Sequence, residues 1–278
     1  MSTPATFDSP TLNTPYALTP EQVQQFQDDG FIKLKDVFDA ETLAYYAQEI
    51  TRLTLDLNPN KGTPLEERST YNQAFIQIGN QWERSEIARE FSFSNRLAQL
   101  ATELLGVSGV RMYHDQSLFK EPSGGFTPWH VDQYYWPMST AMTVTAWIPL
   151  QAVPLEMGPL SFGKGSHRKH IAREVEISEE SDQMIRDEVK RQKIVDVYEP
   201  YDLGEVSFHY GWTLHRAGGN TTEKSRNVHC VIYMDENMVL GEPKSDHEKH
   251  DWKDWSPSTQ VGEVMADALN PVLYSTKS

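Results

Sequence analysis

The sequence has a single cysteine, few positive charges and no long apolar run. One cysteine, Cys230, excludes an internal disulfide framework and a zinc site made of several thiolates, and it fits a reducing compartment such as the cytoplasm. The 25 lysines and arginines against 40 aspartates and glutamates give a net charge of −15, which disfavours nucleic acid and anionic membranes as partners. Because the sequence lacks both a run of about 18 apolar residues and a charged start leading into an apolar stretch, neither a membrane span nor a secretory signal is predicted.

The aromatic content of 11%, with seven tryptophans, indicates a folded core. Residues 1–18 are rich in Thr, Ser, Pro and Asn, which predicts a flexible N-terminal arm. We interpret residues 19–278 as a single domain that begins with helices. Apolar spacing and capping residues predict helices at residues 19–30, 39–57 and 94–106, and a charged helical insertion near residues 178–192.

From residue 107 the sequence changes to short segments rich in Val, Thr, Trp and Tyr, separated by Gly and Pro. Eight of these segments have the composition of strands: residues 110–120, 127–135, 142–150, 159–163, 194–198, 205–209, 213–217 and 226–235. Many short strands with turn signals between them are typical of an all-β sandwich or barrel. We therefore expect a mainly β protein with flanking α-helices.

The segment Trp129-His130-Val131-Asp132 contains the most informative pair of side chains. Residues two apart on a β-strand point to the same face, so His130 and Asp132 would lie side by side. An imidazole and a carboxylate are two of the three ligands in the facial triad of non-haem Fe(II) oxygenases. Because His-x-Asp also occurs by chance as a surface pair, this interpretation depends on a third ligand.

Two downstream histidines, His209 and His215, are candidates for the third ligand. Arg226 follows His215 by 11 residues, and the Gly218-Gly219-Asn220 turn between them allows a hairpin-like return that places Arg226 beside the strand of His215. A guanidinium there would bind a carboxylate through two parallel hydrogen bonds. This spacing favours His215 as the ligand and leaves His209 a packing or hydrogen-bonding role.

The order of these motifs resembles that of the phytanoyl-CoA dioxygenase family of Fe(II)/2-oxoglutarate oxygenases. After His-x-Asp come a Gly-Ser-His turn at residues 165–167, a distal histidine, and an arginine 11 residues later. Further segments resemble family elements: Lys120-Glu121-Pro122, Met157-Gly158-Pro159-Leu160 (with Met for Asn) and Gly204-Glu205-Val206. The resemblance extends over residues 26–234.

The resemblance implies a double-stranded β-helix, or jelly roll, in which His130, Asp132 and His215 are the catalytic metal ligands for Fe(II). It also implies 2-oxoglutarate as co-substrate and O2 as oxidant, with release of succinate and CO2. Related halogenases replace the carboxylate ligand by a small residue. Asp132 therefore favours a dioxygenase that hydroxylates, or otherwise oxidises, a small organic molecule.

Three further residues are assigned to the co-substrate by the same resemblance. Arg226 would bind the 5-carboxylate of 2-oxoglutarate, Trp147 would line that pocket, and Gln116 lies near a family glutamine that contacts 2-oxoglutarate. Ala217 is a departure, because family members often have Ser two residues after the distal histidine. A hydroxyl contact to the co-substrate is then missing or supplied elsewhere.

Two other functions are compatible with parts of this pattern. A non-catalytic jelly-roll protein would bind a metal or a small molecule, but it has no need of the triad together with Arg226. A zinc hydrolase with the same ligands would need a general base, and no glutamate near the motif suits that role. The substrate is a free small molecule or a CoA thioester, whose phosphates would need the basic side chains at residues 164–173.

For several segments, the sequence allows two interpretations. The aromatic run Tyr134-Tyr135-Trp136 either lines a substrate pocket or packs within the β sandwich, and the insertion near residues 178–192 is either a lid or a surface excursion. Cys230 is expected to be a buried apolar side chain. His247 and His250 lie in a charged tail and receive no role. The sequence predicts no nucleic-acid or membrane partner and gives no oligomeric state.

Overall fold

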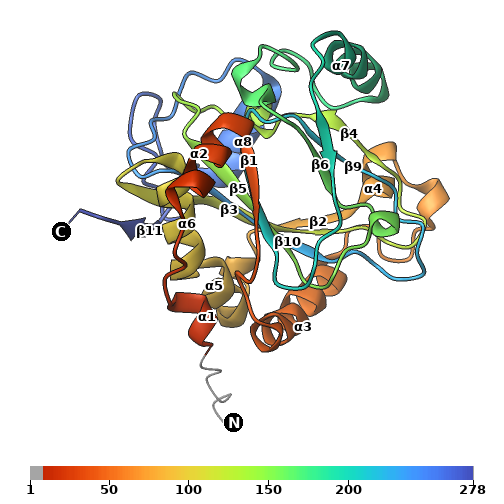
Figure 1. Ribbon diagram of the computed structural model, residues 1–278, viewed down its shortest axis with the longest axis horizontal. Helices are drawn as coiled ribbons and strands as arrows, with labels where there is room; N and C mark the ends of the chain where they lie inside the picture. The colour runs from red at the N-terminus through yellow and green to blue at the C-terminus, as the bar shows by residue number, and fades with distance from the viewer. Residues whose placement is uncertain (1–8, 278) are drawn as a thin grey trace.

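The computed structural model describes residues 9–277, which form two antiparallel sheets (Figure 1). The larger sheet has the strand order β1-β8-β5-β10-β3-β11, and β2 also pairs with β3. Its strands are β1 (Phe31–Leu34), β2 (Ile76–Gly79), β3 (Gly109–Phe119), β5 (Thr143–Pro149), β8 (Val206–Tyr210), β10 (Val228–Asp235) and β11 (Val272–Ser275). The smaller sheet has the order β4-β9-β6-β7. Its strands are β4 (Thr127–His130), β6 (Leu160–Gly163), β7 (Asp196–Tyr198) and β9 (His215–Ala217).

Apolar side chains from the two sheets meet in the space between them. Trp147 and Ile232 of the larger sheet belong to the same buried cluster as Leu160 of the smaller sheet. The rings of Phe31 and Phe162 stack across the interface with their centroids 4.5 Å apart. Two antiparallel sheets packed face to face in this way form the two halves of a jelly roll, which confirms the predicted fold.

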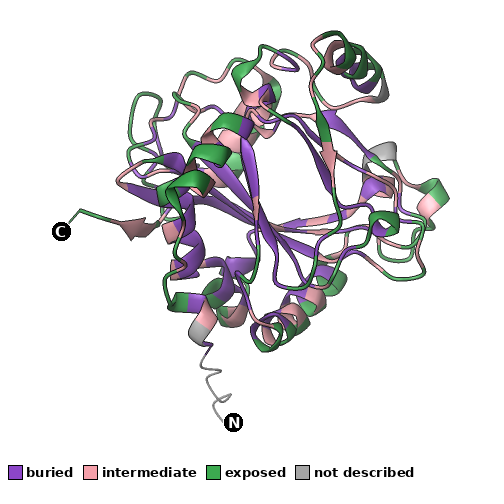
Figure 2. Ribbon diagram, viewed as in Figure 1, coloured by how far each residue is buried: buried purple, intermediate pink, exposed green. Residues whose placement is uncertain are grey.

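Helices cover the opposite face of the larger sheet (Figure 1). They are α1 (Pro10–Asn13), α2 (Pro20–Asp29), α3 (Ala40–Leu57), α5 (Glu86–Ser92) and α6 (Asn95–Leu105). Alternation along β5 separates the two cores: Val144 and Ala146 pack toward the helices, whereas Trp147 packs toward the smaller sheet. Figure 2 shows the central strands buried and the outer faces of the helices exposed.

The helix ends follow the predicted capping residues. Thr19 and Gln22 form a reciprocal capping box at the start of α2, and Gly30 ends that helix with a positive φ of 86°. Ser94 caps the start of α6, and Gly106 ends it in the left-handed conformation. The helices predicted at these positions are therefore confirmed.

The segment predicted to be a flexible arm is ordered from residue 9 onward. Leu12 is only 2% exposed, and its carbonyl accepts a hydrogen bond of 2.7 Å from Ser94 Oγ. Arg96 Nε donates to the Thr14 carbonyl, also at 2.7 Å. The arm prediction is thus wrong for residues 9–18, because one buried leucine and two helix side chains fix this polar segment. Residues 1–8 lie outside the described part of the chain.

Other boundaries also differ from the prediction. The strand predicted at residues 127–135 ends at His130, and a 3₁₀ turn, η3 (Asp132–Tyr135), follows it. The predicted insertion forms α7 (Glu179–Arg191). The prediction lacks β2, α4 (Thr70–Ala74), α5 and α8 (Asp246–Trp255). Among the described helices, none combines the length and the apolar character needed to cross a membrane.

A buried polar network joins the helices to the larger sheet. The Asp115 carboxylate, on β3, accepts hydrogen bonds from the backbone N–H groups of Gln81 and Trp82 at 2.7 and 3.1 Å and from Ser92 Oγ at 2.6 Å. Ser92 Oγ also lies 2.8 Å from His229 Nε2. Burial raises the pKa of Asp115 to about 7 and lowers that of His229 to about 3. This network lies on the helix side of the sheet and is structural.

Asp115→Ala is expected to destabilise the fold by roughly 3 kcal/mol or more, because two buried backbone donors and Ser92 lose their acceptor. The shift in the denaturant midpoint measures this loss. Asp187→Ala, at an exposed position on α7, is the matched control, with an expected change below about 0.5 kcal/mol. Equal midpoints for the two variants would show that the network does not support the fold.

Candidate active site

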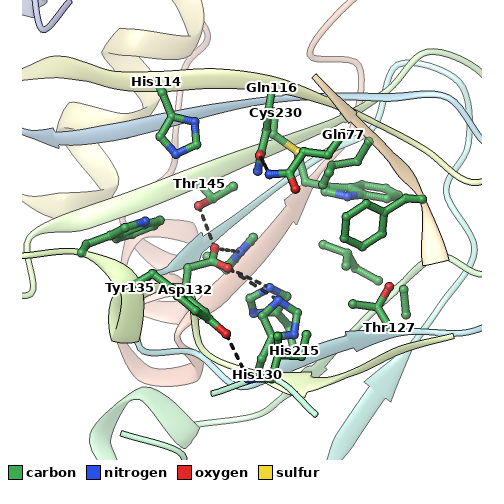
Figure 3. Close-up of a pocket in the computed structure, with 18 of the residues that line it drawn as sticks. Gln77, His114, Gln116, Thr127, His130, Asp132, Tyr135, Thr145, His215 and Cys230 are labelled. Carbon is green, nitrogen blue, oxygen red and sulfur yellow. Dashed lines mark hydrogen bonds and ion pairs between the residues drawn. The ribbon is translucent and has the colours of Figure 1, made fainter. Parts of the chain in front are cut away.

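His130, Asp132 and His215 converge at the small-sheet side of the cavity between the sheets (Figure 3). His130 is the last residue of β4, Asp132 begins η3, and His215 begins β9, where it pairs directly with His130. Asp132 Oδ1 lies 3.6 Å from His130 Nε2 and 3.4 Å from His215 Nε2. The prediction that His130 and Asp132 share one face of a strand is wrong. The two side chains meet because the chain turns after β4.

The two imidazoles are oriented by backbone carbonyls. His130 Nδ1 lies 2.8 Å from the Pro128 carbonyl, and His215 Nδ1 lies 2.9 Å from the Thr213 carbonyl. Because a carbonyl only accepts hydrogen bonds, each Nδ1 carries the proton, and each Nε2 lone pair points toward Asp132. This is the tautomer that a metal ligand requires.

Two side chains of the larger sheet hold the other oxygen of Asp132. Thr145 Oγ1, on β5, donates to Asp132 Oδ2 at 3.2 Å. His209 Nε2, on β8, lies 3.3 Å from the same oxygen. His209 therefore contacts the carboxylate through Oδ2 and not through Oδ1, the oxygen nearest the other two imidazoles, in agreement with the hydrogen-bonding role predicted for it.

The charges at the site suit metal binding. Burial would raise the pKa of Asp132, but the neighbouring His215 and His209 hold it well below its usual range. Burial lowers the pKa of His130 to about 3 and that of His209 to about 4. Burial also lowers the pKa of His215, but the Asp132 carboxylate outweighs that effect and raises it. The site therefore holds an ionised carboxylate beside uncharged His130.

The donor set fits a divalent first-row metal. One ligand atom from each of His130, Asp132 and His215 lies within 4.8 Å of the others, and no other such cluster occurs among the described residues. Two imidazole nitrogens and one carboxylate oxygen are the donors of a facial triad, which leaves coordination positions open.

The triad faces a cavity of about 450 Å³, which Arg226 also lines. The guanidinium is almost fully buried, and its Nη1 donates to the Gly158 carbonyl at 2.7 Å. Arg226 forms no ion pair with any described carboxylate, and burial lowers its pKa to about 10, so it is charged at neutral pH. A buried cation without a counter-charge is ready to bind an anion.

Lys120 is a second buried basic side chain next to Arg226. The two residues form an isolated β-bridge, and Lys120 Nζ donates to the Gly125 carbonyl and lies 3.5 Å from Thr127 Oγ1. Burial, together with the charge of Arg226, lowers the pKa of Lys120 to about 6. Thr127 lines the cavity, so its hydroxyl connects Lys120 to the cavity.

Trp147, Gln116 and Ala217 all line the same cavity. The Trp147 ring packs against Tyr201, with centroids 4.8 Å apart, and lies 5.4 Å from the Arg226 guanidinium. Gln116 accepts a hydrogen bond from Gln77 Nε2. Figure 3 shows Gln116 and Gln77 on the wall opposite the triad.

The route by which Arg226 reaches the cavity differs from the prediction. β9, with His215, belongs to the smaller sheet, whereas Arg226 precedes β10 of the larger sheet. The Gly218-Gly219-Asn220 segment is therefore a crossover between sheets and not a hairpin turn. Arg226 faces the triad across the cavity instead of lying beside the strand of His215.

Several cavity residues were not predicted from the sequence. Thr145 belongs to no sequence motif, and α8 was not predicted. His247, Asp251 and Trp255 of α8 nevertheless line the cavity. Two signals in the sequence point to α8: Ser245 with Glu248 three residues later is a helix-capping pattern, and Trp252 and Trp255 have a helical apolar spacing.

The open interpretations are resolved as follows. Tyr135 and Trp136 line the cavity, whereas Tyr134 packs with Trp129 and Ile185 under α7. α7 lies on the outer side of β4, and Glu176 and Ile177, just before it, border the cavity. Cys230 is buried in the cavity wall, and burial raises the pKa of its thiol.

Comparisons with known proteins agree with this geometry. Residues 26–228 match the family described as phytanoyl-CoA dioxygenase (PhyH). A probable alpha-ketoglutarate-dependent hypophosphite dioxygenase from Stutzerimonas stutzeri is 22% identical over 227 residues, which cover 77% of each chain. A phytanoyl-CoA dioxygenase domain-containing protein 1 from Danio rerio is 29% identical over 136 residues, 46% of each chain.

Solved structures share the fold. The non-heme alpha ketoglutarate dependent epimerase SnoN from nogalamycin biosynthesis superposes with a TM-score of 0.73 at 23% identity, over 91% of this chain and 98% of that one. EctD from S. alaskensis, solved with 2-oxoglutarate and 5-hydroxyectoine, gives a TM-score of 0.71 at 22% identity, over 91% and 89%. Because the family match spans most of the chain, the chain belongs to the phytanoyl-CoA dioxygenase family and is a non-haem Fe(II)/2-oxoglutarate-dependent oxygenase.

Proposed function

We propose that the protein hydroxylates a free small organic molecule at the expense of 2-oxoglutarate and O2, with release of succinate and CO2. One observation carries this proposal: a three-donor cluster and a buried, uncompensated guanidinium line the same cavity. When bound, iron activates O2 and couples the decarboxylation of 2-oxoglutarate to oxidation of the substrate.

The protein's own residues have separate tasks in this proposal. His130, Asp132 and His215 hold the iron, and Thr145 with His209 orients the Asp132 carboxylate. Asp132 supports hydroxylation over halogenation, because it keeps the carboxylate ligand in place.

The co-substrate binds at the other side of the cavity. Arg226 takes the distal carboxylate of 2-oxoglutarate in a charge-assisted pair. Trp147 and Tyr201 form a wall that excludes water from this pair, and Gln116 donates its amide toward the co-substrate. Ala217 supplies no hydroxyl, and Thr127, linked to Lys120, is the hydroxyl that lines the cavity in its place.

A free small molecule is favoured over a CoA thioester by the contacts of the basic side chains at residues 164–173. Lys164 pairs with Asp29 and Arg168 with Asp28, both at 3.0 Å. Arg173 donates to the His167 carbonyl and lies over the Trp212 ring. These three charges already have partners within the protein, which leaves Lys169 as the one lysine or arginine of the segment without a described side-chain partner, and a single lysine is a poor receptor for the phosphates of CoA. A cytoplasmic location stays a prediction of the sequence.

The test is anaerobic addition of Fe(II) and 2-oxoglutarate, followed by O2 and a panel of small molecules. We expect a weak visible charge-transfer band before O2 is added, then succinate release and a product heavier by one oxygen atom. Absence of both the band and succinate would instead support the alternative, a jelly-roll protein that binds a metal or a small molecule without catalysis.

His209→Ala is expected to weaken Fe(II) binding by about 10- to 100-fold, because the Asp132 carboxylate loses one of its two orienting partners. The Fe(II) dissociation constant, measured anaerobically, checks this prediction. His250→Ala, on the exposed part of α8, serves as the control with unchanged affinity. If His209 were itself the third ligand, its loss would remove binding as completely as His215→Ala does.

A further inference from the structure

Helix α8 closes the cavity although it lies outside the residues that match the family. The family match ends at residue 228, and α8 begins at Asp246. Three of its residues, His247, Asp251 and Trp255, line the cavity together with the triad. The part of the cavity that α8 borders therefore lies outside the segment that matches the family and is suited to selecting the substrate.

Close packing holds α8 in this position. The Trp255 ring stacks on His114, with centroids 4.3 Å apart and planes 20° apart. A Cβ atom at Gly79 would lie only 2.7 Å from Trp255, so the absence of a side chain at Gly79 lets the indole approach β2. Trp252 Nε1 donates to the Thr259 carbonyl at 2.9 Å. α8 is thus a fixed wall of the cavity.

Contacts at the rim of the cavity also join α8 to neighbouring segments. His247 Nε2 lies 2.5 Å from the Glu176 carboxylate, which joins α8 to the segment before α7. The backbone N–H of the next residue, Ile177, donates to the Tyr135 hydroxyl at 2.9 Å. Glu176 therefore has a hydrogen-bonding partner of its own at the rim.

Asp251 differs from the other acidic residues around it. The side chains of Asp246 and Asp254 pair with Lys249 and His250 within α8. Asp251 lines the cavity and forms no ion pair with any described residue. Burial, and next the charge of Asp254, raises its pKa to about 7. Trp255 and Tyr113 are its uncharged hydrogen-bonding partners, so a cationic ligand would favour the ionised carboxylate.

The end of the cavity at Asp251 lies far from Arg226, as measured along β3. Arg226 bridges to Lys120, whereas Trp255 stacks on His114, six residues earlier on β3. At about 3.3 Å per residue, the two ends are separated by roughly 20 Å. The two ends of the cavity therefore differ, with the Arg226 guanidinium at one end and the Asp251 carboxyl of α8 at the other.

Apart from the Glu176–His247 pair at the rim, the walls around Asp251 are aromatic or uncharged. Trp255, Trp136 and Tyr135 all line the cavity. Figure 3 shows the His114 ring pointing into it, and this residue is only 5% exposed. Burial lowers the pKa of His114 to about 4, so it is neutral and does not repel a cation. Aromatic faces attract cations in addition to the carboxylate.

We infer that Asp251 binds a protonated nitrogen of the substrate, so that the molecule oxidised is a small amine or ammonium compound. This inference rests on the proposed function and specifies its substrate class. The N–H groups, or the charged face of a quaternary ammonium, meet the Asp251 carboxylate, and Trp255 and Trp136 enclose the adjoining carbon atoms. The neighbouring carbons then extend from α8 toward the triad.

The experiment compares three probes of one shape in the protein loaded anaerobically with Fe(II) and 2-oxoglutarate. The probes are cyclohexylamine, cyclohexanol and cyclohexanecarboxylate, which are cationic, neutral and anionic at pH 7.5. Tryptophan fluorescence reports binding, because Trp255 and Trp136 lie in the wall. We expect cyclohexylamine to bind about tenfold or more tightly than cyclohexanol, and the carboxylate to bind most weakly.

Asp251→Asn should remove this preference, so that cyclohexylamine and cyclohexanol bind about equally, and Asp251→Glu should restore part of it. The matched control is Asp246→Asn, which removes the same charge from the same helix at a side chain that is 97% exposed. The control keeps the preference of the unmodified protein. Circular dichroism confirms that each variant is folded.

Two results would overturn the inference: tightest binding of the carboxylate, or an amine preference that Asp251→Asn leaves intact. The charge-transfer band of the unmodified protein is measured in the same sample and tests the proposed function separately. A normal band without an amine preference contradicts only the substrate class. An amine preference without a band contradicts only the oxygenase assignment of the site.

Discussion

His130→Ala is expected to abolish Fe(II)-dependent succinate release. The variant removes one of the three donors that lie within 4.8 Å of one another, and the described residues contain no second cluster of this kind to replace it. Changes to groups that only orient metal ligands cost about 10- to 100-fold. Loss of a ligand should therefore lower turnover by more than about a hundredfold, measured as succinate formed per enzyme.

The same variant should lose the anaerobic charge-transfer band, which reports binding without catalysis. His170→Ala is the matched control, because that histidine is 73% exposed and pairs only with Glu174. The control is expected to keep both the band and turnover. Full activity in His130→Ala would mean that the metal binds elsewhere and that the His130, Asp132 and His215 assignment is wrong.

Arg226→Ala is expected to raise the KM for 2-oxoglutarate by about 100-fold or more. Removing one partner of a buried charge pair costs roughly 2–5 kcal/mol, and each 1.4 kcal/mol is a factor of ten. The effect should fall mainly on KM, because in the proposed arrangement Arg226 binds the end of 2-oxoglutarate that does not react. Steady-state kinetics with varied 2-oxoglutarate separate KM from kcat.

The variant should remain folded, because removing Arg226 also removes a positive charge next to buried Lys120. Arg191→Ala, at an exposed and locally paired position on α7, is the control with an unchanged KM. An unchanged KM in Arg226→Ala would show that 2-oxoglutarate binds through another cation, and Lys120 is the nearest candidate.

Local patterns predicted much of the fold because they act over a few residues. The caps Thr19 and Ser94 and the stops Gly30 and Gly106 depend only on their own helices, and the structure confirms them. α8 escaped prediction because none of its residues is fully buried, so its sequence lacks a clear apolar face. Its position depends instead on a tertiary contact between Trp255 and Gly79, which no local pattern encodes.

The candidate site, like the fold, contains residues that local patterns predicted and residues that they did not. The spacing of His130, Asp132 and His215 predicted a cluster, and the structure brings these residues together. Thr145 and Asp251 belong to the site only because β5 and α8 bring them there from distant parts of the chain. The hairpin proposed between His215 and Arg226 was wrong because glycine-rich turns do not tell whether a chain returns within a sheet or crosses to another.

In the proposed arrangement, the iron and the distal carboxylate of 2-oxoglutarate would be held by different layers of one sandwich. The triad belongs to the smaller sheet and the turn that follows it, whereas Arg226, Trp147 and Gln116 belong to the larger sheet or its edge. Because 2-oxoglutarate would bind the metal at one end and Arg226 at the other, the spacing between the layers has to match the length of that molecule. A volume change at the Phe31–Phe162 stack would change this spacing while leaving every ligand in place, so it would alter the fit of the co-substrate as well as the packing of the core.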